Sequence, residues 1–220
     1  MTGTRADAPL CPTCGQPASE ALGGPEHDWE CRNEACSEFG QPVRADEPPA
    51  RRRFGPGNGS LVVKTYREGM AAKVGHDLVI EVTRWAATLD ASGALELTAD
   101  SRSLAVREGL GGVKPLTDGD RDEIRRNIDG KVLAGQPIAF RSSAVRMPDR
   151  PGRFSVDGEL TMAGRTRPVS AQLELRDDGR VAGTITLTQS DWGIKPYRGL
   201  MGALKVRDEV EIVVDARYDA

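Results

Sequence analysis

The sequence predicts a mainly β protein: an eight-stranded antiparallel barrel with one mid-chain helix, preceded by a small cysteine-bearing ribbon. Apolar and polar residues alternate in four C-terminal segments, 154–162, 169–175, 181–188 and 210–218. A period of two gives a sheet one dry and one wet face. Few helices are available to cover the dry face, so closure of the sheet into a barrel is the simplest way to bury it. All four cysteines lie near the N-terminus, which sets that part of the chain apart.

Composition limits the classes of function. With 220 residues, 38% of them hydrophobic and 29% charged, the chain suits one sizeable soluble domain with a small appendage. The net charge of −3 does not favour nucleic acid or an anionic membrane as the main partner. No apolar run reaches the roughly 20 residues of a transmembrane helix, and residues 1–7 lack the apolar stretch of a signal peptide. We therefore expect a cytoplasmic protein.

Changes in composition divide the chain into three parts. Residues 1–40 form a zinc-ribbon-like segment, short and interrupted by glycine and proline. Residues 41–58 combine proline, charge and glycine without periodicity, which is typical of a linker. Residues 59–220 carry the periodic segments and form the barrel.

The cysteine spacing predicts a metal site with the ligands Cys11, Cys14, Cys31 and Cys36. Two close pairs separated by sixteen residues suit a tetrahedral zinc ion, and four thiolates leave no open position, so the zinc is structural. A redox dithiol is the alternative, but it needs a βαβ context that is missing. His27 offers a replacement ligand, although a loop histidine facing solvent is the simpler interpretation. The segment resembles zinc ribbons in shape only.

The barrel elements follow one another with few gaps. Residues 60–66 read as the first strand, and 68–74 as a short helical turn ending at Gly75. Residues 77–89 are long and β-branched, which indicates two strands with a bend near Arg84; a hairpin returns through 94–98. Thr117 caps a helix that runs to Leu133. A strand over 138–145 and the four alternating segments complete the barrel.

Two motifs in this region resemble those of the YceI-like family of lipocalin-like proteins. One is the hairpin Gly158-Glu-Leu-Thr-Met-Ala-Gly-Arg-Thr-Arg-Pro-Val169, and the other is Ser190-Asp-Trp-Gly-Ile194. His76, after the first strand, and the helix before the strand at 137–140 also fall where that family places them. The resemblance covers about residues 59–220.

The resemblance implies a barrel whose interior binds a long isoprenoid or a similar amphiphile, such as a polyprenyl chain or a quinone, without catalysis. Many members of the family are exported and most lack a cysteine module, so this chain departs from the common pattern twice. From the residues alone, a lumen filled by side chains is as consistent with the pattern as a ligand cavity. The resemblance favours the cavity.

Ten side chains are candidates for ligand binding. Trp85, Phe140, Trp192 and Tyr197 are the aromatic residues expected to line or gate the mouth, with core packing as the alternative. Alternation places the remaining candidates on the inner face or in the loop after it: Val156, Leu160, Met162, Ile185, Leu187 and Ile194. Residues 193–205 suit a mobile flap, a plain strand connection or a homodimer contact. His76 and Asp77 suit a turn cap better than a site for a polar head group.

The sequence does not favour an enzyme. Only His27 and His76 offer an imidazole base, and the chain has no Gly-x-Ser-x-Gly elbow, Walker loop or dinucleotide fingerprint. The alternative to a lipid carrier is a zinc-dependent interaction or nucleic-acid-binding protein that uses the barrel as scaffold. Arg51–Arg53 beside Trp29 and Phe39 would suit such binding, but a solvated linker charge run is the simpler interpretation. In either case the ribbon offers a docking site for a protein partner.

Overall fold

The computed structural model describes residues 8–11, 13–20, 29–43, 52–90, 93–146 and 152–217. Two compact units emerge, one comprising residues 1–52 with 89–94 and the other 53–88 with 95–220. His27, Tyr218 and residues 44–51 of the expected linker, Arg51 among them, lie outside the described residues. Within 41–58, Arg52–Phe54 forms strand β3 of the main sheet.

The N-terminal unit is a small ribbon built around the cysteines. Strand β1 (Ser19–Glu20) pairs antiparallel with β2 (Trp29–Glu30), and single bridges join Leu10 to Pro17 and Glu30 to Pro42. Its buried side chains are three of the cysteines, Ala18 and Val43. So small a core cannot stabilise a fold by burial alone, and a metal is the usual supplement.

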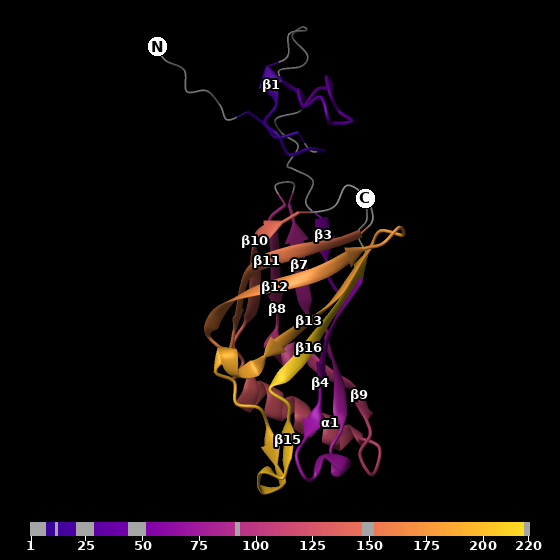
Figure 1. Ribbon diagram of the computed structural model, residues 1–220, viewed down its shortest axis with the longest axis vertical. Helices are drawn as coiled ribbons and strands as arrows, with labels where there is room; N and C mark the ends of the chain where they lie inside the picture. The colour runs from indigo at the N-terminus through magenta and orange to yellow at the C-terminus, as the bar shows by residue number, and fades with distance from the viewer. Residues whose placement is uncertain are drawn as a thin grey trace. The chain divides into compact units, whose positions relative to one another are not determined.

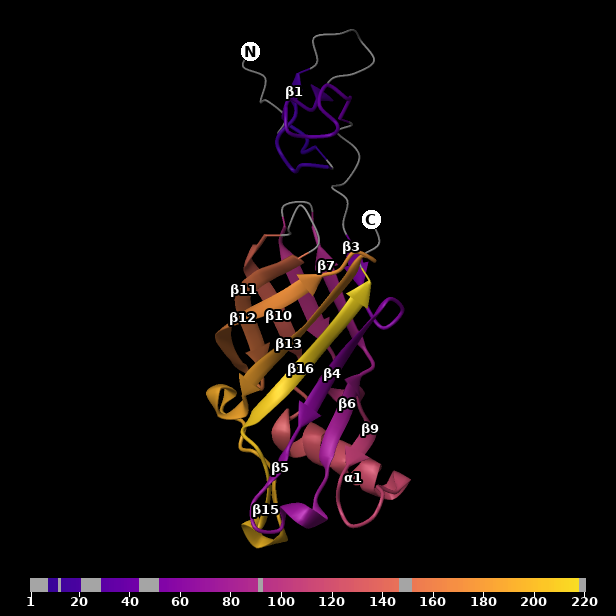
Figure 2. The same cartoon turned by 45° about the vertical axis from the view of Figure 1, so that its right-hand side comes forward.

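The second unit is an antiparallel sheet that curls into a half-barrel (Figures 1 and 2). The order of its eleven strands is β3-β7-β8-β10-β11-β12-β13-β16-β4-β6-β9. In chain order after β3 they are β4 (Gly59–Thr65), β6 (Asp77–Val82), β7 (Trp85–Leu89), β8 (Leu95–Ala99), β9 (Leu104–Leu110), β10 (Ile138–Val145), β11 (Gly152–Met162), β12 (Arg165–Leu175), β13 (Arg180–Thr188) and β16 (Glu209–Arg217). The C-terminal alternation thus produced β11, β12, β13 and β16, as the sequence predicts.

The expectation of eight strands needs correction, because the main sheet has eleven. The two strands that the sequence pattern does not predict are β3, inside the expected linker, and β9. At one corner of the sheet two long strands are each broken in two. Strand β6 continues into β7 after Thr83 and Arg84, and β8 continues into β9 through the short 3₁₀ helix η2 (Ser101–Ser103). Before the break β6 pairs with β9, near one end of the strand order, and after it β7 pairs with β8, near the other. The chain itself therefore joins the two ends of the ladder.

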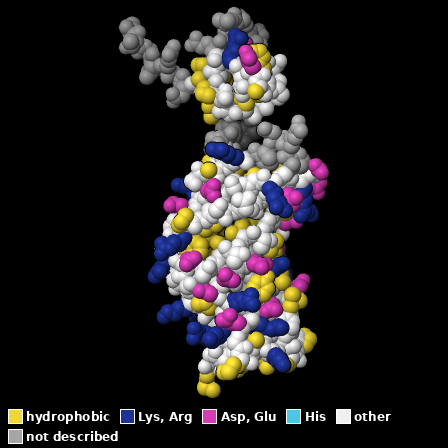
Figure 3. Space-filling model, in the orientation of Figure 1, with side chains coloured by type: hydrophobic (Ala, Val, Ile, Leu, Met, Phe, Trp, Pro, Cys, Tyr) yellow, Lys and Arg dark blue, Asp and Glu magenta, His cyan; other side chains and the backbone are white. Residues whose placement is uncertain are grey.

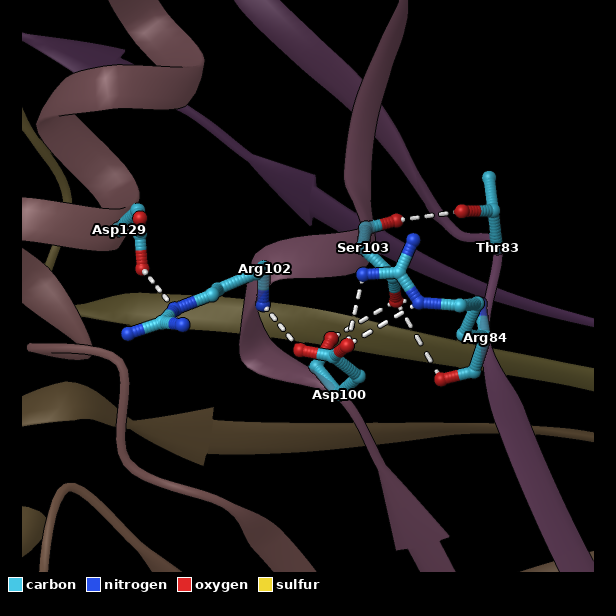
Figure 4. A network of polar contacts seen from close by, with 6 residues as sticks. All are labelled: Thr83, Arg84, Asp100, Arg102, Ser103 and Asp129. Atoms are coloured by element: carbon cyan, nitrogen blue, oxygen red, sulfur yellow. Dashed lines mark hydrogen bonds and ion pairs between the residues drawn. The ribbon is translucent and has the colours of Figure 1, made fainter.

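Side chains fix this corner (Figure 4). Ser103 is buried, and its Oγ accepts from the Arg84 amide at 3.0 Å and donates to the Asp100 carbonyl at 2.7 Å. The Asp100 carboxylate accepts from the Arg84 guanidinium at 2.6 Å and from the Arg102 amide at 2.8 Å. These bonds replace the ladder hydrogen bonds that the bend interrupts, as buried backbone groups require. The bend predicted near Arg84 is confirmed.

One α-helix, α1 (Asp118–Asn127), lies among the described residues and continues as a π-helical turn, η3 (Ile128–Val132). It begins as predicted at Thr117, whose hydroxyl accepts from the Asp120 amide while the Asp120 carboxylate accepts from the Thr117 amide. This reciprocal capping box satisfies two otherwise free amides of the first turn. Ile128, Val132 and Leu133 pack on the main core. No helix among the described residues has the length and apolarity needed to cross a membrane.

A second, smaller sheet lies at one end of this unit. It has the order β14-β15-β5, formed by Arg198–Gly199, Leu204–Val206 and Arg67–Glu68. Short 3₁₀ helices flank it: η1 (Ala72–Val74), η4 (Gln189–Trp192) and η5 (Leu200–Gly202). The segment 193–205 therefore contains two short strands and a helical turn. Of the three interpretations of this segment (flap, strand connection or homodimer contact), this structure is closest to a strand connection.

Candidate functional site

The four cysteine sulfurs form one compact cluster. All four Sγ atoms lie within 4.8 Å of one another, with Cys11–Cys36 at 4.0 Å and Cys14–Cys31 at 3.7 Å, and none is in a disulfide. The Cys-x-x-Cys turn is closed by the amide of Gly15, which has φ 69° and donates to the Cys11 carbonyl at 2.8 Å. The left-handed φ explains why glycine follows the second cysteine.

This geometry fits zinc. A tetrahedral ion with Zn–S bonds of about 2.3 Å places its sulfurs about 3.8 Å apart. The Cys11–Cys36 and Cys14–Cys31 sulfur separations lie on either side of that value. The Glu38 amide donates to Cys36 Sγ at 3.4 Å, an arrangement that stabilises negative charge on the sulfur. The residues present can therefore hold a metal through four thiolates.

The pKa values of the cysteine thiols also support a metal site. Burial, followed by the neighbouring thiols, raises the pKa of Cys31 to about 12. For Cys14 burial also acts to raise the pKa, but hydrogen bonds from the Gln16 backbone, Asn33 and the other thiols lower it to about 7. The protein alone thus favours one thiolate and disfavours others beside it. A bound cation would offset the opposing shifts of Cys14 and Cys31 by favouring thiolate at both positions.

The inner face of the curled sheet is a continuous apolar surface. One row of register partners crosses five strands: Ile185, Ile212, Val63, Ile80 and Val106. A second row crosses β11, β12, β13, β16 and β4: Phe154, Leu173, Gly183, Val214 and Leu61. All of these except Gly183 belong to the two hydrophobic clusters of the unit.

This face is incompletely covered by the protein itself. Ile80 is only 2% exposed, but its row partners Val63, Val106, Ile185 and Ile212 are only partly buried. The same holds for Leu97, Leu160, Met162 and Val214, which also pack on the core. Core side chains of a filled barrel would be fully buried. These side chains of the apolar face therefore stay partly exposed to solvent.

Nine of the ten predicted ligand-binding residues lie in the two clusters. The main cluster contains Trp85, Leu160, Met162, Ile185, Leu187, Trp192 and Ile194, and the smaller one contains Phe140 and Val156 and also borders Ile185. Tyr197 is the exception: it is 37% exposed and lies beside Gly199 of the small sheet. The structure brings nine candidates to one face and leaves Tyr197 outside it.

The Ser190–Ile194 motif anchors one end of this face. Trp192 and Ile194 are 3% and 5% exposed, and the Trp192 indole donates to the Leu160 carbonyl at 3.0 Å. Gly193 between them has φ 72°, which lets the chain turn and bury both neighbours. Ser190 is held by Asp208, which accepts from its amide at 2.8 Å and from its hydroxyl at 2.5 Å. The motif therefore closes an end of the sheet with apolar side chains.

Trp85 differs from Trp192 in one respect. It is 8% exposed and packed in the main cluster, yet its indole N–H finds no acceptor among the described residues. A buried donor without an acceptor costs on the order of 1–3 kcal/mol. Such a group inside an apolar face is suited to meet an acceptor atom of a ligand.

His76 and Asp77 act on the backbone, as the turn-cap interpretation expects. A ring nitrogen of His76 lies 2.8 Å from the Lys114 carbonyl, and Asp77 Oδ1 accepts from the Arg67 amide at 2.8 Å. Arg67 in turn donates to the carbonyls of Gly75 and Leu110. These contacts tie three loops together.

Sequence reasoning missed the part of the inner face that comes from β4 and β16. Leu61 and Val63 in β4, and Val210, Ile212 and Val214 in β16, alternate with polar or outward-facing residues just as clearly as the predicted ligand-binding residues of β11 and β13 do. The alternation could therefore have identified them. The lack of an acceptor for the Trp85 indole N–H could not be predicted from the sequence, because it depends on which groups surround the indole in three dimensions.

Comparisons with known proteins agree with this architecture. Residues 63–218 match the YceI-like domain family. The crystal structure of Burkholderia cenocepacia BcnA is similar at a TM-score of 0.51 and 17% identity, over 71% of this chain and 94% of that one. A polyisoprenoid binding domain from Saccharophagus degradans, implicated in plant cell wall breakdown, gives a TM-score of 0.48 and 10% identity, over 76% and 98%. At such identities the likeness concerns the fold alone. No curated protein matches the chain.

Proposed function

The chain belongs to the YceI-like domain family, and from that premise we propose that it binds a long-chain isoprenoid or similar amphiphilic lipid, non-catalytically, on the inner face of its sheet. The observation that carries the proposal is the partly exposed row Ile185, Ile212, Val63 and Val106. An apolar surface inside a curled sheet that its own side chains leave open to solvent gains free energy when a ligand covers it.

The magnitude is sufficient for tight binding. Each buried methylene gains about 0.8 kcal/mol, so ten of them gain on the order of 8 kcal/mol before the cost of immobilising the chain. No charged contact with the tail is required. The nine clustered candidates and the residues of β4 and β16 supply the apolar contacts in this proposal.

Trp85 narrows the class of ligand. Its buried N–H would be satisfied by an oxygen acceptor, so we favour an amphiphile with a carbonyl or hydroxyl group over a pure hydrocarbon. A quinone with an isoprenoid tail has both features. The tail would cover the aliphatic rows and the oxygen would accept from the indole.

We further propose that the metal of the ribbon is zinc and that its role is structural. Four thiolates fill the tetrahedral shell, which leaves no position for water or substrate. The fit of the sulfur separations to a tetrahedron supports this choice. The residues that would hold it are Cys11, Cys14, Cys31 and Cys36.

Lipid analysis of the native protein tests the carrier proposal. The full chain is purified from its own cells without detergent, extracted with organic solvent and examined by mass spectrometry. We expect a polyprenyl or prenylquinone species at close to one molecule per chain, absent from a mock purification. Preparations that are consistently empty, and that also fail to take up a prenylquinone added in vitro, would contradict the proposal.

A further inference from the structure

The end of the barrel domain that carries the small sheet has an unusual surface, which we call the basic tip. It consists of residues 66–75, 110–114 and 197–207. Hydrogen bonds hold the three segments together: β15 pairs with β5, the Ala71 amide donates to the Ala203 carbonyl at 3.0 Å, and the Arg67 guanidinium donates to the Leu110 carbonyl at 2.6 Å. The tip is thus one structural unit of this domain.

Large apolar side chains project from the basic tip into solvent. Met70 is 97% exposed and Met201 is 108% exposed, and Val113 and Leu200 follow at 74% and 59%. Of the nine exposed large hydrophobic residues among the described parts of the chain, seven belong to the tip. Figure 3 shows apolar side chains at this end of the domain with Lys and Arg beside them. A soluble surface rarely gathers such residues without a partner.

The backbone holds two of these side chains outward at a cost. Leu200 and Met201 are consecutive non-glycine residues with φ of 48° and 54°, in the left-handed region. This conformation is unfavourable for an L-residue, and burial does not offset its free-energy cost, because both side chains are exposed. Strain of this kind is retained where the conformation serves a function.

The charge of the basic tip is opposite to that of the whole chain. The tip contains the basic residues Arg67, Lys73, Lys114, Arg198, Lys205 and Arg207, and a single acidic one, Glu68. Asp77, just outside it, lies 3.9 Å from Arg67, and Glu68 is the register partner of Lys205. Even so the tip is strongly cationic, in a protein whose net charge is −3.

We propose that the basic tip docks on an anionic phospholipid bilayer. Exposed Met, Leu and Val side chains suit the boundary between head groups and acyl chains, and the surrounding Lys and Arg suit the negative surface of such a membrane. A protein partner would have to match projecting apolar side chains with a pocket and the cations with carboxylates. A bilayer meets both needs at once, so the charge complementarity favours lipid.

Flotation with vesicles of defined composition tests this proposal. The full-length protein is mixed with vesicles of phosphatidylcholine alone or of an equimolar mixture with phosphatidylglycerol, both free of isoprenoid, so the outcome does not depend on the proposed cargo. We expect preferential binding to the anionic vesicles that weakens with salt. Each Lys or Arg near the surface contributes roughly a fivefold increase in partitioning. Lys73→Glu with Arg198→Glu should therefore weaken binding by roughly 25-fold or more.

Matched variants separate docking from general effects. Met70→Ser with Met201→Ser removes exposed apolar groups and should also reduce binding, whereas Phe39→Ser in the ribbon, 45% exposed, should not. Arg146→Glu with Arg153→Glu makes the same charge change outside the tip and should cost much less than the tip reversal. Equal binding to both vesicle types, or equal losses in tip and control variants, would overturn the proposal. So would a dimer in solution that the methionine variants dissociate while vesicle binding is absent.

Discussion

At the scale of single residues, Trp85 carries the most specific information about the proposed ligand. Two tryptophans lie in one apolar cluster, and Trp192 donates to a carbonyl of the sheet while Trp85 has no acceptor among the described residues. Natural cores seldom leave a donor in that state. The contrast indicates that the position of Trp85 is suited to an atom that arrives with the ligand.

Replacing Trp85 with Phe tests this interpretation. The variant keeps an aromatic ring and loses the N–H, so binding of a quinone with an isoprenoid tail should weaken by roughly 2- to 10-fold, the value of one net hydrogen bond. Binding of squalene, which has no oxygen, should change little and serves as the control for altered packing. Both are measured by tryptophan quenching or by competition. Equal losses for the two ligands would assign Trp85 a packing role only.

Asp100 carries a second prediction, which concerns pH. The hydrogen bond from Arg84, then that from the Arg102 amide, holds the pKa of Asp100 below its ordinary value of 3.8. The carboxylate therefore stabilises the fold above about pH 4, and this contribution disappears as the pH falls through the lowered pKa. Asp100→Asn should lower the urea midpoint at pH 7 and differ less from the parent near pH 3. Asp177→Asn, on an exposed turn, is the control; a gap that widens in acid would contradict the assignment.

Individual residues were predictable to different degrees. The grouping of the four cysteines could be predicted from the sequence because each close pair is local, with its two cysteines only three or five positions apart. Tyr197 lies exposed beside the small sheet, because η4 and the left-handed turn at Gly193 lead the chain out of β13 before it reaches this residue. A glycine-rich connection does not reveal its direction in the sequence.

At the scale of secondary structure, the two faces of strand β16 provide an internal control. Ile212 and Val213 are neighbours with similar exposure, but Ile212 packs on the main cluster while Val213 pairs with Val62 and Thr184 on the opposite face. Adjacent residues of a strand always point to opposite sides. Function on the inner face should therefore respond to one of them and not to the other.

The matched variants are Ile212→Trp and Val213→Trp. A larger side chain at 212 fills space on the inner face, so the affinity for a prenylquinone should fall by roughly tenfold or more, equivalent to at least about 1.4 kcal/mol. The same change at 213 adds its bulk outside and should leave binding near the parent value. Titration and thermal melting are measured together, so that overpacking is recognised as a lowered melting temperature. An unchanged affinity in the 212 variant would argue against an inner-face site.

Secondary structure elements were largely predictable where their signals are local. Period-two alternation identified the C-terminal strands, Thr117 marked the start of the helix, and the break near Arg84 was visible in the sequence. The different pairing partners of β6 and β7 were not predictable, because pairing depends on residues far along the chain. Strands β3 and β9 also have no place in the predicted eight-stranded barrel, whereas the sheet has eleven strands.

At the scale of the whole molecule, the net charge can be read from the sequence, but where the charges gather depends on the fold. A net charge of −3 argued against an anionic membrane as partner, yet three segments far apart in the sequence combine six basic residues at one end of the domain. Only the tertiary structure reveals this concentration. An averaged charge therefore excludes a partner only when the charges are evenly spread.

The two units make a prediction about metal removal. The ribbon buries little beyond its cysteines, whereas the sheet has two hydrophobic clusters of its own. Binding of a structural zinc is worth about 10–16 kcal/mol in small fingers, so its loss should unfold the ribbon and leave the barrel folded.

We expect elemental analysis to give close to one zinc per chain, and none in the Cys11→Ser/Cys14→Ser variant. Limited proteolysis of that variant, or of the chelated protein, should then digest residues before about position 52 and spare the sheet with its ligand affinity intact. Cleavage throughout the sheet after chelation would mean that the stability of the sheet depends on the metal. Ser101→Ala is the control: it changes a buried residue at the corner of the sheet and leaves the four cysteines intact, so it should weaken the sheet alone.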